Sequence, residues 1–386
     1  MFQYGKNFWL VCFSMFLFMA SFNLILPDMN DFITILEGAH LKGLIITLFT
    51  ISSAIARPFS GKLADLVGRK KVMIIGMGVT AIVSLIYPLS FSVLFFLFLR
   101  FLHGFSAGFF PTGATALLTD IMPSNKRGVG MGIWGTFVSL GIGAGQSLGS
   151  LISKQLGLTN LFMIACGVAI ISGILVINVK ETLEERESFS IKHLKLKWND
   201  IIEPSVFPSA VVMFLTASCS GIIFVLSPDI SNFLKIENKG WFFIFYVLTT
   251  IIVRLFLSSL SDRIGRRKTL LIGITFLIAS MLIVGSARDV IMYTLGSIIF
   301  GIATGISSPT LFAWTADLSH PKRRGVGAGT LFIALEAGIF LGSILTLITY
   351  DNDFPSVFNS FLSGSLVAII AFAYLVWHLM FKSSAT

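Results

Sequence analysis

Twelve long apolar runs recur along the 386 residues of the chain, and they constrain its fold more than any other feature. A helix that crosses a bilayer needs about 20 mostly apolar residues, and the runs have about that length. Only 12% of the residues are charged, against about 25% in soluble domains. The sequence therefore predicts an all-α integral membrane protein with twelve transmembrane helices. The runs lie at residues 8–28, 43–62, 72–90, 93–116, 129–152, 160–179, 205–228, 240–260, 269–287, 290–315, 326–349 and 356–381.

The distribution of Lys and Arg predicts the orientation in the membrane. With the N-terminus inside, about 20 of the 28 basic residues fall in inner segments and only about 5 in outer loops. Both termini are therefore expected in the cytoplasm, and the protein in a plasma or inner membrane. Topology then accounts for the net charge of +9, so membrane lipids are expected partners and nucleic acid is not. The first run lacks a small-residue cleavage site, which favours a span over a cleaved signal peptide.

An internal repeat relates the two halves of the chain. The segment 57–71 aligns with the segment 254–268 at an offset of 197 residues. The same offset pairs Gly104 with Gly301, Asp120 with Asp317, and Arg127 with Arg324. The hydrophilic stretch 180–204 separates the two copies. The sequence therefore predicts two pseudo-symmetric six-helix bundles, residues 1–179 and 205–386, joined by a cytoplasmic linker at 180–204.

A parallel duplication of six-helix units is typical of one large class of secondary transporter. The chain has no phosphate-binding loop of the ATPase type, no metal-ligand spacing and no set of side chains suited to nucleophilic catalysis. Its three cysteines all lie inside apolar runs, where buried thiols act as small hydrophobes. We therefore expect a transporter and not an enzyme. It would be driven by an ion gradient, with protons as the expected ion, and would need no cofactor or metal.

The turn between the second and third spans carries a motif of glycines and charges, formed by Gly61, Asp65, Gly68 and Arg69. The glycines allow a tight turn and a close approach of helices. Asp65 can cap the following helix or pair with a nearby arginine. An ordinary turn that keeps basic residues on the inner side would look similar. However, the pattern recurs at the equivalent turn of the second half, at Asp262, Gly265 and Arg266.

This motif resembles the signature loop of the major facilitator superfamily, G-x-x-x-D-x-x-G-R-[KR]. The resemblance implies a conformational latch that holds the cytoplasmic side shut while the outside is open. The second copy departs from the pattern, because Ser258 replaces its first glycine, and its latch is expected to be looser. Charged residues repeated at the following inner turns complete the expected latch: Asp120, Arg127, Asp317 and Arg324.

Arg100 and His103 lie within the fourth span. A charge at that depth is costly, so Arg100 should face the bundle interior or a wet cavity. The segment resembles the R-x-x-[Q]-G motif of the same superfamily, which is linked to proton coupling, with His103 in place of Gln. Histidine can titrate near neutral pH. The alternative is a structural Arg100 bonded to carbonyl groups, with His103 as a packing residue.

The fifth span carries a face of small residues, Gly141, Gly145 and Gly149, suited to close helix packing. It resembles the motif G-x-x-x-G-P-x-x-G-G of the drug/proton antiporter branch, and the resemblance implies export. Gln146 and Ser150 depart from the motif. Packing alone would also explain the glycines.

Glu336 is the only acid at mid-depth in a span, so it is a hypothetical proton site, with a neutral carboxyl bonded between helices as the alternative. Asp28, with Asn23 about one turn deeper, could form a second proton or cation site or could simply be solvated. Arg57 and Arg254 could line the central cavity and favour anionic substrates, or could extend to the inner surface.

Together these features predict an alternating-access carrier, a functional monomer with a small-molecule substrate. The favoured function is proton-coupled export of small apolar or amphipathic compounds. The alternative is proton-coupled uptake of a small nutrient or an anionic metabolite. A lipid flippase or a non-transporting membrane receptor is a weaker third hypothesis.

Overall fold

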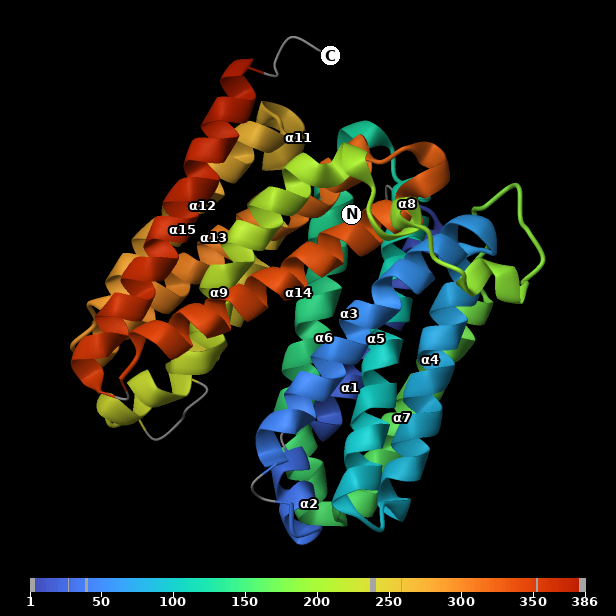
Figure 1. Ribbon diagram of the computed structural model, residues 1–386, viewed down its shortest axis with the longest axis horizontal. Helices are drawn as coiled ribbons and strands as arrows, with labels where there is room; N and C mark the ends of the chain where they lie inside the picture. The colour runs from blue at the N-terminus through green and yellow to red at the C-terminus, as the bar shows by residue number, and fades with distance from the viewer. Residues whose placement is uncertain are drawn as a thin grey trace. The chain divides into compact units, whose positions relative to one another are not determined.

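The computed structural model describes residues 4–26, 28–38, 41–236, 241–257, 259–351 and 353–381, and these residues form helices with no strand among them (Figure 1). Twelve long helices in this described part coincide with the twelve apolar runs. They are α1 (Lys6–Ile25), α3 (Lys42–Leu66), α4 (Arg69–Ile86), α5 (Val93–Ile121), α6 (Arg127–Leu156), α7 (Leu158–Ile177), α9 (Phe207–Phe233), α10 (Trp241–Leu257), α12 (Arg266–Gly285), α13 (Val290–Leu318), α14 (Arg324–Thr349) and α15 (Phe354–Phe381).

Shorter helices connect them. The α-helical ones are α2 (Met29–Ile35), α8 (Trp198–Ile201) and α11 (Leu260–Ile264). The 3-10 turns are η2 (Tyr87–Leu89), η3 (Ser124–Lys126), η4 (Ile191–Leu194), η5 (Pro204–Val206) and η6 (Pro321–Arg323).

Ten helices of the described part are long and apolar enough to cross a membrane, and α10 is a shorter apolar helix of 17 residues. Many large apolar side chains on these helices are exposed, among them Ile82, Leu94, Phe256 and Leu347. Exposed apolar surface of this extent needs an apolar solvent, which a bilayer supplies. The prediction of an all-α, multi-pass membrane protein is therefore confirmed.

The chain divides into two compact units. Unit 1 comprises Met1–Met122, Phe137–Pro204 and Ser319–Phe332. Unit 2 comprises Pro123–Thr136, Ser205–Leu318 and Ile333–Thr386. The first part of α6, residues 127–136, thus belongs to unit 2, and the first part of α14, residues 324–332, belongs to unit 1.

The helices pack in the same pattern within each unit. In unit 1, α5 packs against α3 and α4, and α7 packs against α1 and α4. In unit 2, α13 packs against α10 and α12, and α15 packs against α9 and α12. Figure 1 shows α12, α13 and α15 side by side, as it does α3, α4 and α5. The repeat in the sequence therefore corresponds to a repeat in helix packing.

Glycines allow the turns that precede α4 and α12. Gly68 has φ of +136° and Gly265 has φ of +90°, values that residues with a side chain rarely adopt. Each glycine directly precedes the arginine of its motif, Arg69 or Arg266. The turn thus places that arginine at the first position of the next helix.

Helix α6 packs on α1 through its row of glycines. A Cβ atom would lie 2.5 Å from the Phe16 carbonyl oxygen at Gly141, 2.7 Å from that of Ala20 at Gly145, and 2.1 Å from that of Leu24 at Gly149. In unit 2, Gly338 and Gly342 bring α14 equally close to α9. These contacts need glycine because the two backbones meet directly.

The α6–α1 contact predicts which glycines tolerate a methyl group. Gly149→Ala should force the two backbones apart and lower the free energy of unfolding by ~1–3 kcal/mol. Gly143→Ala on the same helix should change little, because no heavy atom lies within 4 Å of its Cβ position. Thermal unfolding of both purified variants in detergent is the measurement. Equal melting temperatures would contradict this packing.

Candidate functional site

Asp65 lies near the end of α3, and its carboxylate caps a helix from the other half of the chain. Oδ1 accepts a hydrogen bond from the backbone N–H of Gly325 at 2.7 Å, and Oδ2 accepts one from Val326 at 2.9 Å. These amides form the first turn of α14, where backbone N–H groups lack helical partners and the helix dipole is positive. Of the two roles expected for Asp65, capping of the following helix is wrong, because Asp65 caps α14 and not α4. The alternative, pairing with a nearby arginine, is what the structure shows.

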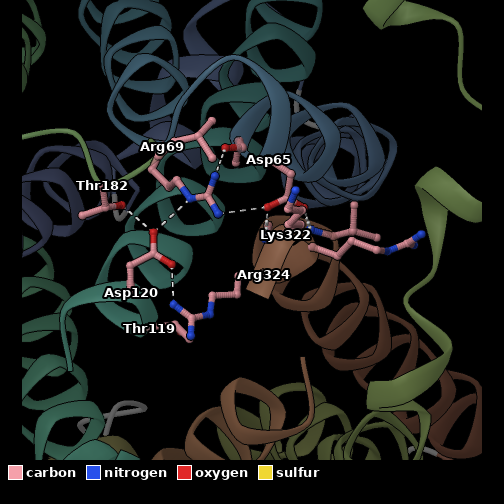
Figure 2. A network of polar contacts seen from close by, with 12 residues as sticks. Asp65, Arg69, Thr119, Asp120, Thr182, Lys322 and Arg324 are labelled. Atoms are coloured by element: carbon pink, nitrogen blue, oxygen red, sulfur yellow. Dashed lines mark hydrogen bonds and ion pairs between the residues drawn. The ribbon is translucent and has the colours of Figure 1, made fainter. Parts of the chain in front are cut away.

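Arg69 connects Asp65 to Asp120. Its guanidinium lies 3.4 Å from Asp65 Oδ1 and 3.1 Å from Asp120 Oδ2. Arg324 lies 2.6 Å from the other oxygen of Asp120. Figure 2 shows Asp120 between the two arginines, with the hydroxyl of Thr182 on the same carboxylate. We call Asp65, Arg69, Asp120 and Arg324 the unit 1 latch, in which two carboxylates balance two guanidinium groups.

Unit 2 contains the same network at residues related by the offset of 197. Asp262 accepts from the backbone N–H groups of Gly128 and Val129, both at 3.0 Å, and so caps α6. Arg266 pairs with Asp262 and lies 2.8 Å from Asp317. Arg127 lies 2.7 Å from the other oxygen of Asp317. We call Asp262, Arg266, Asp317 and Arg127 the unit 2 latch. The structure thus brings all eight charged residues predicted for the latch into two equivalent clusters.

Gly61 allows the close approach on which the unit 1 latch depends. A Cβ on Gly61 would lie 3.0 Å from the carbonyl oxygen of Gly325, and one on Gly325 would lie 2.5 Å from that of Gly61. A side chain at either position would push α14 away from Asp65. Ser258, the equivalent of Gly61 in the second half, lies outside the described residues, so its expected effect stays a prediction.

Glu181, in the segment after α7, is a contributor that the sequence did not reveal. Its carboxylate accepts from the backbone N–H groups of Arg69 at 3.2 Å and Lys70 at 3.0 Å, and so caps α4. A Cβ on Gly68 would lie 2.5 Å from this carboxylate, which gives Gly68 a second reason to be glycine. No such contact surrounds Gly265, where a Cβ would have no heavy atom within 4 Å. A Glu followed by Thr in a linker carries no local signal for a partner more than 100 residues away.

Arg57 and Arg254 are buried in their units and contact helices from the other half of the chain. Arg57 donates to Thr112 Oγ1 at 3.2 Å and stacks on Phe332, with its Cζ 4.0 Å from the ring centroid. Arg254 donates to the carbonyl oxygen of Gly135 and to Ser308 Oγ. Gly135 and Phe332 are themselves related by the offset of 197, so the two arginines occupy equivalent places.

Arg100 and His103 meet at a tyrosine that the sequence did not single out. Tyr87 Oη lies 3.2 Å from Nδ1 of His103 and accepts from Arg100 at 3.5 Å. Arg100 also donates to the carbonyl oxygen of Ile45 and lies over the ring of Phe49, 4.9 Å from its centroid. All three side chains of the cluster are at most 1% exposed. The structure thus places the two residues in one dry polar cluster in unit 1.

Asp28 and Asn23 each contact α6. Asp28 accepts from Ser153 Oγ at 2.9 Å, and Asn23 accepts from the amide of Gln146 at 3.2 Å. Asn23 also donates to the Met19 carbonyl within α1. Glu336 lies in α14, is half-buried and belongs to unit 2, whereas Arg100 belongs to unit 1. The roles of these residues in binding or proton coupling stay predictions.

Long apolar helices, duplicated packing and two equivalent latches define a polytopic membrane carrier built from a repeat. The model of the Major Facilitator Superfamily matches residues 8–237 and 210–385. The chain therefore belongs to the Major Facilitator Superfamily and is a transporter of small molecules, not an enzyme.

Two curated relatives resemble almost the whole chain. It is 27% identical over 370 residues to "Multi-drug resistance efflux pump PmrA" of Streptococcus pneumoniae, covering 89% of this chain and 88% of the relative. It is 27% identical over 367 residues to "Multidrug resistance protein 2" of Bacillus subtilis, covering 90% of each. Among solved structures, the human organic anion transporter MFSD10 superposes with a TM-score of 0.83 at 20% identity, over 96% of this chain and 98% of that one. At that identity the likeness shows the shared fold.

The buried position of Asp65 makes the unit 1 latch sensitive to pH. Burial raises the pKa of Asp65 to about 7, against the lowering effects of Arg69 and of the two amides it accepts from. An exposed Asp has a pKa of about 3.9, so the latched state takes up a proton that an open state releases. Proton uptake by Asp65 therefore stabilises the latched state fully below about pH 4, and this stabilisation is lost as the pH rises through about 7.

We therefore expect the Gly325 and Val326 amides to be better protected from hydrogen exchange as the pH falls from about 8 to about 5. The measurement is the protection factor of a peptide that contains both residues, after correction for intrinsic exchange. Asp65→Asn should give a flat profile because it cannot titrate. Protection that rises with pH, or an equal slope in the variant, would contradict the assignment.

Asp65→Asn should also slow transport without abolishing substrate binding. The amide keeps one acceptor oxygen but turns its NH₂ group toward one of the backbone N–H donors. We expect this change to weaken the cap by ~1 kcal/mol and to lower turnover about fivefold. Turnover and KM in proteoliposomes are the measurements. Glu184→Gln is the matched control, since Glu184 is exposed nearby and the change removes the same charge. Unchanged turnover at equal expression would count against the latch.

Proposed function

We propose that the protein exports small apolar or amphipathic compounds across the cell membrane in exchange for protons. The similarity to a multi-drug resistance efflux pump and to a multidrug resistance protein, over about nine-tenths of each chain, carries this proposal. The row of glycines on α6, which resembles the motif of the drug/proton antiporter branch, supports it. Carriers of this superfamily generally use ion gradients and no cofactor, which supports an ion gradient as the energy source.

In this proposal the two latches face the cytoplasm and both chain termini lie on that side. The excess of Lys and Arg in the latch segments supports the orientation. The functional bundles are residues 1–179 and 205–386, joined by the linker 180–204, and a monomer surrounded by lipid suffices. Transport proceeds by alternating access, which exposes the substrate to one side of the membrane at a time.

The latches control this cycle because they bind helices of one half of the chain to turns of the other half. While Asp65 caps α14 and Asp262 caps α6, the cytoplasmic path is shut. Opening requires both carboxylates to leave their helix ends and become solvated. Protonation of Glu336 would supply the coupling, and the cluster of Arg100, Tyr87 and His103 would respond to the same cycle.

Proton-coupled uptake of a small nutrient or an anionic metabolite is the alternative. The observation that favours it is the burial of three arginines, Arg57, Arg100 and Arg254, all at most 7% exposed. Counterflow across a panel of sugars and small hydrophilic acids separates uptake from export, because an exporter of apolar or amphipathic compounds should exchange neither.

Glu336→Gln should uncouple export from the proton gradient. The amide cannot take up a proton, so we expect proton-driven efflux in everted vesicles to fall at least tenfold, while passive counterflow persists. Glu37→Gln is the matched control because it removes an exposed carboxylate near α2. Proton-driven efflux that survives in Glu336→Gln would refute the coupling role of this residue.

A further inference from the structure

Unit 2 contains a cavity of about 250 Å³ between helices α9, α10, α13 and α14. That volume is slightly below the ~300 Å³ at which small-molecule sites usually begin, so it suits a compact ligand. Its walls are largely apolar, and among the described residues that line it Arg254 is the only charged one.

The cavity is elongated, with an aromatic end and a cationic end. Tyr246 and Arg254 both line it and lie eight residues apart on α10, which corresponds to about 12 Å. Phe224 lines the cavity and packs on Phe243, which in turn packs on Tyr246, so Phe224 marks the same end as Tyr246. Ser308 accepts from Arg254 and marks the other end.

The hydroxyl groups of the lining differ in what they can offer a ligand. Thr216 donates its proton to the Val212 carbonyl at 2.8 Å, and Thr304 donates to that of Phe300 at 2.9 Å. These two can only accept further hydrogen bonds. Ser308 Oγ accepts from Arg254, so its O–H remains able to donate. The Arg254 end of the cavity therefore offers a guanidinium and a hydroxyl donor side by side.

We propose that this cavity binds amphipathic organic monoanions. The carboxylate or sulfonate group contacts Arg254 and Ser308, because charge-assisted hydrogen bonds to guanidinium and hydroxyl donors suit an anionic oxygen. The apolar body extends toward Phe224 and Tyr246. The inference rests on the proposed function and names the substrate class of that transport.

Binding of an anion also affects the contact between α10 and α6. Arg254 donates to the carbonyl oxygen of Gly135, and a bound acid group competes for the same guanidinium. A Cβ on Gly135 would lie 3.1 Å from the Arg254 guanidinium carbon, so the two helices meet closely there. Occupation of the cavity thus weakens one contact that holds the first part of α6 in unit 2.

The test measures binding to the purified full chain and does not require transport. Phenylacetate, phenylethanol and phenylethylammonium share one apolar body and differ in charge. Their affinities are compared at fixed ionic strength by the shift in melting temperature. We expect phenylacetate to bind at least tenfold more tightly than the other two.

Variants locate the site. Ser308→Ala should weaken phenylacetate about fivefold, the loss of one hydrogen bond, and Arg254→Gln at least tenfold. Arg254→Lys, which keeps the charge, should retain part of the affinity and replaces Arg254→Gln if that variant does not fold. Arg288→Gln is the matched control, because it removes an exposed guanidinium of unit 2 remote from the cavity lining.

Equal or tighter binding of phenylethylammonium would overturn the proposal. Phenylacetate affinity that is the same in Ser308→Ala, Arg254→Lys and Arg288→Gln would overturn it too. Everted vesicles test the proposed function separately: export of cationic drugs without phenylacetate binding refutes only the anion site. Selective phenylacetate binding without any proton-driven transport supports the anion site and refutes only the proposed export.

Discussion

The interaction on which the structure depends is a buried carboxylate at the N-terminus of a distant helix. Asp65 accepts from two amides of α14, and Asp262 accepts from two amides of α6. A helix start carries unpaired N–H groups and about half a positive charge, so a carboxylate both pairs and neutralises it. Since each carboxylate is at most 7% exposed, losing its partners leaves a buried charge unless water enters. The contacts within each latch should therefore break together.

The duplication makes the two latches equivalent, and later divergence makes them differ. Four charged residues and two amides recur at an offset of 197, and the helix packing around them recurs as well. Glu181 caps α4 in unit 1, whereas the start of α12 has open space around Gly265. Arg57 stacks on Phe332, whereas the equivalent Arg254 meets the backbone of Gly135 and the cavity beside it. Equivalent positions in the two units thus carry different contacts.

The length of the apolar runs was enough to predict the helices, because about 20 apolar residues in a row indicate a membrane span by themselves. The turn glycines were predictable too, because the conformation of a tight turn depends on the residues within the turn. The partners of buried polar groups were not: Asp65 meets α14 across 260 residues, and Glu181 meets α4 across 111. Tyr87 is likewise an ordinary aromatic residue in the sequence, and only the fold shows that Arg100 and His103 share it.

We expect the latch between the α3–α4 turn and the start of α14 to open during transport. Spin labels on Lys71→Cys and Lys322→Cys, both exposed positions of unit 1, would measure this separation in proteoliposomes. Two distances are expected, and their populations should shift when a transported compound and a proton gradient are supplied. Asp65→Asn should enrich the longer distance. A single distance, unchanged by substrate, gradient or this substitution, would show that the latch does not open during transport.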